Sequence, residues 1–136
     1  MQLTPIITVH LSAALAGTAV GAVALWTRRS GGARPRLHRM AGYAWVLLML
    51  VTAISAIFMR DYRLPNLAGY TPIHLLVPAL LAGLIQAFWR LARSDIAGHR
   101  RAMRITYAAA CLVAGAFTLL PGRYLGDLLW HGLLGL

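Results

Sequence analysis

Long uncharged runs separated by short arginine clusters limit what this chain can fold into. No charged side chain occurs in residues 1–27, and further apolar runs follow each later arginine cluster. Of the 136 residues, 60% are apolar and 12% are charged, whereas soluble domains are about half apolar and about a quarter charged. Because a membrane-spanning helix needs roughly 20 apolar residues, the pattern predicts an integral membrane protein rather than a soluble domain.

Four spans are predicted, at residues 6–26, 39–59, 71–91 and 99–120 of a single transmembrane domain. Thr4-Pro5 and Thr71-Pro72 each indicate a helix N-cap followed by proline at the first helical position. The linkers are short, so neighbouring spans are expected to pack antiparallel in an all-α, up-down-up-down four-helix bundle. The tail, residues 123–136, is expected to lie on the outer surface as an interfacial helix or to dock on a partner protein.

The arginines predict how the chain is oriented in the membrane. All 13 basic residues are arginine, and they lie between the spans rather than on one face, which favours membrane anchoring over nucleic-acid binding. The side that carries both termini has only Arg60, Arg63 and Arg123. The positive-inside rule therefore places the other two loops in the cytoplasm and both termini on the outer, periplasmic side. Those two loops carry the remaining arginines, which are Arg28, Arg29, Arg34, Arg36, Arg39, Arg90, Arg93, Arg100, Arg101 and Arg104.

Four of the five histidines fall into two pairs that are matched in membrane depth. His10 and His74 lie near the outer ends of the first and third spans, and His38 and His99 lie at the inner starts of the second and fourth. Because alternate helices of an up-down ring are diagonal to each other, each diagonal carries one pair. Two facing imidazoles are the axial ligands of a b-type haem, and without a C-x-x-C-H motif the haem is non-covalent. The sequence therefore predicts one or two haem b groups, with these histidines as the iron ligands.

Small residues and arginines surround the histidines. Four small residues follow His10 along one face of the first span, where they either leave room for a porphyrin edge or serve ordinary helix packing. These four are Ala13, Ala14, Gly17 and Gly21. Arginines beside the inner pair either bind haem propionates through paired hydrogen bonds or anchor lipid headgroups. The arginines assigned to cofactor binding are Arg36, Arg39, Arg100 and Arg104.

Two short stretches recur in the two halves of the chain. Thr4-Pro5-Ile6 recurs as Thr71-Pro72-Ile73, and His38-Arg39 recurs as His99-Arg100. A duplicated two-helix hairpin would produce both recurrences and both histidine pairs.

Two resemblances to known families rest on particular residues. The string Leu37-His38-Arg39-Met40-Ala41-Gly42-Tyr43 resembles the H-R-x-x-G-Y element of ascorbate-reducible, transmembrane di-haem cytochromes b, which implies that His38 is an axial ligand and that the glycine lies near the porphyrin. Residues 8–123 resemble a family of small bacterial membrane proteins labelled domain of unknown function 2306, which implies a four-span protein of the bacterial inner membrane. The second resemblance rests on Pro35-Arg36-Leu37-His38-Arg39, Pro72-Ile73-His74-Leu75-Leu76, His99-Arg100-Arg101-Ala102-Met103 and Gly115-Ala116-Phe117-Thr118-Leu119-Leu120-Pro121-Gly122-Arg123.

These observations lead to one main functional prediction and two alternatives. The main prediction is transmembrane electron transfer by a di-haem b-type cytochrome, a membrane oxidoreductase if it is an enzyme, with a quinone or a periplasmic redox protein as its donor or acceptor. The first alternative is an accessory or scaffolding subunit of a larger membrane complex, docked through residues 128–136. The second is a metal-binding or transport protein, which is disfavoured because each histidine pair supplies only two ligands.

Overall fold

The computed structural model describes residues 3–29, 35–63 and 65–136, and within these ranges the chain is predominantly helical. No β-strand occurs among the described residues, where Leu67 and Tyr70 form an isolated bridge. Gly31, Gly32 and Arg34, which the sequence places in the first arginine-rich loop, lie outside the described residues. The helices are α1 (Pro5–Arg29), α2 (Pro35–Phe58), η1 (Pro72–Leu75), α3 (Leu76–Ala92), α4 (Ile96–Tyr107), η2 (Ala108–Val113), α5 (Ala114–Thr118), α6 (Tyr124–Asp127) and η3 (Leu128–Leu133).

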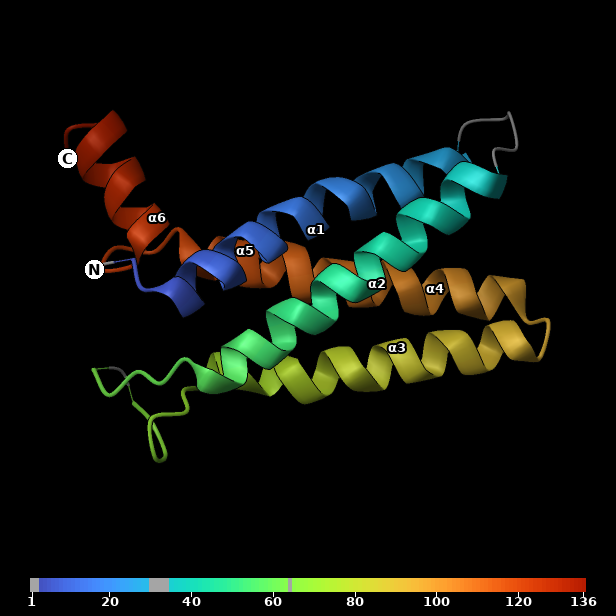
Figure 1. Ribbon diagram of the computed structural model, residues 1–136, viewed down its shortest axis with the longest axis horizontal. Coiled ribbons are helices and arrows are strands. Elements are labelled where there is room, and N and C mark those ends of the chain that lie inside the picture. The colour runs from blue at the N-terminus through green and yellow to red at the C-terminus, as the bar shows by residue number, and fades with distance from the viewer. Residues whose placement is uncertain (1–2, 30–34, 64) are drawn as a thin grey trace.

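The long helices run along the long axis of the molecule, and each reverses the direction of the one before it (Figure 1). They pair as two hairpins, because α1 packs most extensively against α2, and α3 packs against α4. Contacts between the hairpins are sparser. The two chain termini lie at the same end of the molecule as the start of α3, and the starts of α2 and α4 lie at the other end (Figure 1).

In the described ranges, three helical stretches are long and apolar enough to cross a membrane. They are Pro5–Thr27, Pro35–Phe58 and Pro72–Ala92, which agree with the first three predicted spans. The fourth predicted span, residues 99–120, corresponds to the stretch from α4 to α5, whose first half is rich in arginine. The membrane crossing of this stretch, and with it the four-span topology, stays a prediction.

Both helix starts that the sequence marks with proline are confirmed. α1 begins at Pro5, and the Ile7 nitrogen lies 3.4 Å from the Thr4 hydroxyl oxygen. η1 begins at Pro72, directly after Thr71, and continues into α3. Proline suits these positions because its φ is already helical and the first helical N–H has no partner within the helix.

Glycines on α1 let the core side chains of α2 approach closely. Trp45 and Met49 are each 2% exposed and belong to the central apolar cluster. A Cβ atom at Gly17 would collide with the Met49 side chain, and one at Gly21 would lie 2.6 Å from a Trp45 ring carbon. Core side chains therefore fill the space beside both glycines. At Gly17 and Gly21 the small residues of α1 therefore serve helix packing, and the room that a porphyrin edge would need beside them is taken.

Ser94, in the turn between α3 and α4, has a φ of 59°, a left-handed conformation that favours glycine. Replacing Ser94 with glycine is expected to raise the free energy of unfolding by about 1 kcal/mol. Thermal unfolding in detergent measures this change. Ser94→Ala keeps the Cβ atom and is the matched control, so an equal gain with alanine would contradict the backbone explanation.

Candidate functional site

His38 and His99 make equivalent hydrogen bonds in the two hairpins. His38 is in the first turn of α2, and its Nδ1 is 2.9 Å from the Ala24 carbonyl oxygen on α1. His99 is in the first turn of α4, and its Nδ1 is 2.8 Å from the Ala87 carbonyl oxygen on α3. In each hairpin the histidine at the start of the second helix therefore bonds to the backbone of the first helix.

These bonds determine which ring nitrogen carries the proton. A carbonyl oxygen only accepts hydrogen bonds, so the Nδ1 atoms of His38 and His99 are the donors. In a neutral imidazole the other nitrogen, Nε2, then has the lone pair. Histidines that ligate metals typically donate their second N–H in this way, which holds the tautomer and the ring orientation. Both histidines are therefore prepared to ligate a metal through Nε2.

His38 and His99 are half-buried, and exposed arginines lie near both in the sequence. A Cβ atom at Gly42, one turn after His38, would meet no atom within 4 Å. Four arginines predicted to bind a cofactor are exposed, and no ion pair in the described ranges engages them: Arg36, Arg39, Arg100 and Arg104. Guanidinium groups without an acidic partner suit the carboxylates of a haem or the phosphates of lipids.

Asp95 organises the turn that precedes His99. It is the N-cap residue of α4, where the Gly98 N–H donates to Oδ1 at 2.9 Å and Arg90 Nη1 donates to Oδ2 at 2.7 Å. The Gly98 hydrogen bond first, and the Arg90 bond second, lower the pKa of the Asp95 carboxyl from its ordinary value of 3.8. The cap holds the first turn of α4 and thereby positions His99.

Acid is expected to weaken this cap. Because the pKa of Asp95 is lowered in the folded chain, the carboxylate contributes stability above pH 3.8, and the contribution is lost as the pH falls through the lowered pKa. The thermal midpoint in detergent should therefore fall as the pH drops below about 4. The amide oxygen of Asp95→Asn still caps the helix but does not titrate, so this part of the pH dependence should vanish. An unchanged slope in the variant would contradict the assignment.

His10 on α1 bonds to α2 in a similar way. Its Nδ1 is 3.0 Å from the Thr52 carbonyl oxygen and 3.0 Å from the Ser55 hydroxyl oxygen. The Ser55 hydroxyl donates to the same carbonyl at 2.9 Å, so Nδ1 carries the hydrogen and Nε2 has the lone pair.

No hydrogen bond or ring contact joins the inner pair, His38 and His99, in the described part of the chain. Their hydrogen bonds run to α1 and α3 instead. In the same described residues, no hydrogen bond or ring contact joins His10 to His74 either, and their bonds run to the carbonyl oxygens of Thr52 and Met59.

His74 uses both of its ring nitrogens in hydrogen bonds. The Thr71 N–H donates to Nδ1 at 3.0 Å, so Nδ1 has the lone pair. Nε2 then carries the hydrogen and donates it to the Met59 carbonyl oxygen at 2.8 Å. The tautomer of His74 is therefore opposite to that of His10, His38 and His99, and its Nε2 has no lone pair for a metal.

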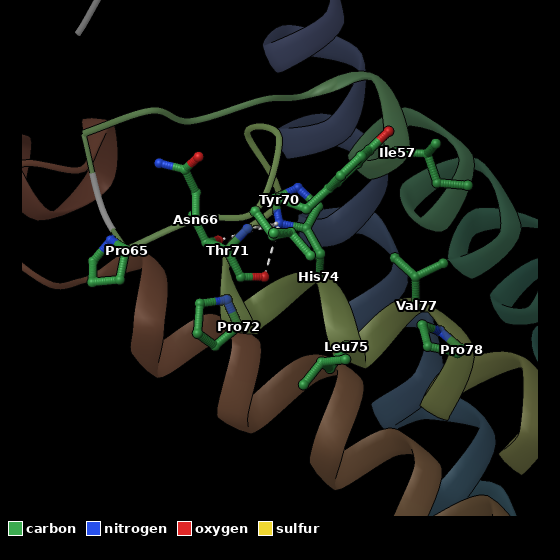
Figure 2. Close-up of a pocket in the computed structure, with 11 residues that line it drawn as sticks. Ile57, Pro65, Asn66, Tyr70, Thr71, Pro72, His74, Leu75, Val77 and Pro78 are labelled. Atoms are coloured by element: carbon green, nitrogen blue, oxygen red, sulfur yellow. Dashed lines mark hydrogen bonds between the residues drawn. The ribbon is translucent and has the colours of Figure 1, made fainter.

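Residues 59–71 connect α2 to η1 and are expected on the outer side of the membrane, so they are called the outer loop. A cavity of about 600 Å³ lies beside His74, between the end of α2, the outer loop and the start of α3 (Figure 2). This volume is within the range of small-molecule sites, roughly 300–1,000 Å³. The Tyr70 ring stands edge-on to the His74 ring, with the centroids 5.2 Å apart, and the Arg60 guanidinium lies 5.2 Å from the Tyr70 centroid. Most of the lining is apolar, and it includes Ile57, Pro72, Leu75, Val77 and Pro78.

Asp61 connects the outer loop to the stretch that follows α5. Its Oδ1 is 3.8 Å from Arg63 Nε, and its Oδ2 is 3.6 Å from Arg123 Nη1. The Arg123 guanidinium also lies 5.1 Å from the centroid of the Phe117 ring. Two of the three arginines expected on the outer side therefore share one carboxylate.

The backbone partners of the histidines were not predicted from the sequence. Every residue has a carbonyl oxygen, so side-chain type carries no signal for this role. One signal does exist, because Thr71 and His74 have the spacing of a capping box, in which the third residue after the N-cap bonds back to the N-cap N–H. The described residues contain no cluster of three or more histidine, cysteine or acidic side chains that could hold a metal ion. The missed carbonyl oxygens belong to Ala24, Thr52, Met59 and Ala87.

The C-terminal tail leaves the long helices at an angle near the end that carries the N-terminus (Figure 1). Trp130 Nε1 donates to the Leu119 carbonyl oxygen at 2.9 Å and so attaches the tail to the end of the last long stretch. Leu133 and Leu136 are 77% and 75% exposed. The tail therefore presents apolar side chains outside the helix pairs.

Apolar helices of spanning length define this chain as a helical integral membrane protein. The sequence profile of the family described as "Predicted membrane protein (DUF2306)" matches residues 7–127. The chain belongs to this family, as the four strings of the sequence analysis predict. The comparisons with curated proteins and with solved structures gave no match. The resemblance to di-haem cytochromes b stays a prediction.

Proposed function

We propose that this protein binds haem b between its helices and transfers electrons at the membrane. The observation that carries the proposal is the repeated bond of His38 to Ala24 and of His99 to Ala87. It leaves an Nε2 lone pair on one histidine of each hairpin, and two such imidazoles are the axial ligands of a six-coordinate haem. A bound haem supplies one-electron redox chemistry.

The inner pair has the donor atoms that haem requires, and the outer pair has them in part. His38 and His99 each carry hydrogen on Nδ1 and a lone pair on Nε2. His10 meets the same condition through its bond to Thr52. His74 does not, because its Nε2 donates to the Met59 carbonyl oxygen. Both histidines of the inner pair therefore have the lone pair that iron ligation requires, whereas only one histidine of the outer pair has it.

The residues of the chain have two tasks in this proposal. The Nδ1 hydrogen bonds of His38 and His99 hold the ring orientation and raise the basicity of Nε2. The exposed arginines of the inner face compensate the negative charge of the propionates. In the proposal, a bound haem would cover the half-buried rings of His38 and His99.

A visible spectrum of the protein, purified in mild detergent after expression with added haem precursor, tests the proposal. We expect a Soret band that shifts and sharpens on reduction with dithionite. Protein that stays colourless, also after incubation with hemin, would contradict it. His131 is exposed in the tail, so His131→Gln controls for haem that binds to surface histidine.

An accessory subunit of a larger membrane complex is the second candidate function. The exposed leucines of the tail favour it, since Leu133 and Leu136 present apolar surface at the outer end. Copurification of a partner with the full chain, but not with a chain that ends before Tyr124, would support this candidate. Haem in the purified chain without any partner would speak against it.

A further inference from the structure

The His74 ring joins two segments that are adjacent in space but separated by the outer loop. Met59 follows the last residue of α2, and Thr71 precedes the first residue of η1. The ring accepts a hydrogen bond from the Thr71 N–H at 3.0 Å and donates one to the Met59 carbonyl oxygen at 2.8 Å. One side chain therefore closes the base of the loop that connects the two hairpins.

Backbone hydrogen bonds within the outer loop hold its shape next to the His74 ring. The Asp61 N–H donates to the Gly69 carbonyl oxygen at 2.9 Å, and Leu67 and Tyr70 exchange backbone hydrogen bonds at 2.9 and 3.0 Å. Tyr70 stacks edge-on against the His74 ring (Figure 2). The loop thus has its own internal bonds, and His74 attaches its base to the end of α2.

Ligation of iron by His74 is incompatible with both of its hydrogen bonds. Nε2 would have to give up its hydrogen and turn its lone pair away from the Met59 carbonyl oxygen. The hydrogen would then reside on Nδ1, which could no longer accept from the Thr71 N–H and would donate instead to the Thr71 carbonyl oxygen, 3.2 Å away. The other three histidines need no such change, because their Nδ1 atoms already donate.

We propose that His74 is a clasp that holds the outer loop to the end of α2, and that the chain binds one haem, at the level of His38 and His99. The role of His74 as a clasp is inferred from its hydrogen bonds alone. The count of one haem per chain rests on the proposed function. His74 is in this view a positioning residue for the connection between the hairpins. The outer level is then not a haem site, although the sequence pairs His10 with His74 there.

Two substitutions at His74 separate a clasp from an iron ligand. The amide of His74→Gln has an N–H near the position of Nε2 and can still donate to the Met59 carbonyl oxygen, but it does not ligate haem iron. His74→Ala removes both roles. His131→Gln in the exposed tail is the matched control. Haem per chain is measured by the pyridine haemochrome method, and loop opening is measured as the rate of tryptic cleavage after Arg60 and Arg63 in detergent.

We expect one haem per chain in the wild type, in both His74 variants and in His131→Gln. Cleavage of the loop should accelerate by about tenfold in His74→Ala, as the loss of a partly buried hydrogen bond implies, and should stay near the wild-type rate in His74→Gln. Two haems in the wild type, halved by both substitutions, would overturn the inference while leaving the proposed function intact. Equal cleavage rates in all four proteins would overturn the clasp. A wild type without haem would refute the proposed function. The cleavage rates would still show whether His74 holds the outer loop to the end of α2.

Discussion

Alanine in place of either His38 or His99 is expected to remove haem from the purified protein. Each ring has its Nδ1 hydrogen on a backbone carbonyl oxygen and its Nε2 lone pair available, so each supplies one of the two axial bonds. Removing a residue that only hydrogen-bonds to a metal ligand lowers metal affinity by roughly 10–100-fold. Removing a direct ligand should therefore lower the affinity for haem by more than about 100-fold. The Soret absorbance per chain, measured at limiting hemin, reports the change.

Chemical rescue distinguishes ligation from folding. In His38→Gly and His99→Gly the missing ring leaves space for an imidazole from the buffer, which should restore the Soret band in part. Rescue requires that the rest of the site is intact, so it would exclude general misfolding. His131→Gly is the control, because the exposed His131 should affect neither haem content nor its response to imidazole. Full haem content in both His38→Ala and His99→Ala would contradict the assignment of the inner pair.

The positions of the first three spans were predictable because they depend on local composition. Spans need long apolar runs, and the chain supplies these between arginine clusters. The starts at Pro5 and Pro72 were predictable for the same reason, since threonine followed by proline acts within one turn of helix. The pairing of His38 with His99 at one membrane depth stays a prediction.

The atoms that the histidines contact were not predictable from the sequence. His38 and His99 bond to carbonyl oxygens 14 and 12 residues earlier in the chain, and the choice depends on how each hairpin turns its helices about their axes. The tautomer follows from those contacts, so it was equally out of reach. His74 shows the consequence, because its sequence position matches that of His10 in depth while its hydrogen bonds give it the opposite tautomer. The π-helical turns of η2 have no sequence signature either.

Leucine in place of Gly83 is expected to separate α3 from α4 and to lower the free energy of unfolding by about 3 kcal/mol, at the upper end of ordinary overpacking. Any Cβ atom at Gly83 would collide with the hydroxyl oxygen of Thr106 and would lie 3.2 Å from its Cβ and Cγ2 atoms. Thr106 is 5% exposed, and its hydroxyl donates to the Ala102 carbonyl oxygen at 2.7 Å, so moving it away would disturb the packing and break this hydrogen bond. Thermal unfolding in detergent measures the loss.

The same substitution should also reduce haem binding. Gly83 and Ala87 are four residues apart on α3 and therefore face α4 along one line. Pushing the helices apart at Gly83 should lengthen the bond from His99 Nδ1 to the Ala87 carbonyl oxygen, now 2.8 Å, and release the ring. Gly115→Leu is the matched control, because a Cβ atom there meets nothing within 4 Å. If both leucine variants lost stability and haem equally, the close contact of α3 with α4 would not be what positions His99.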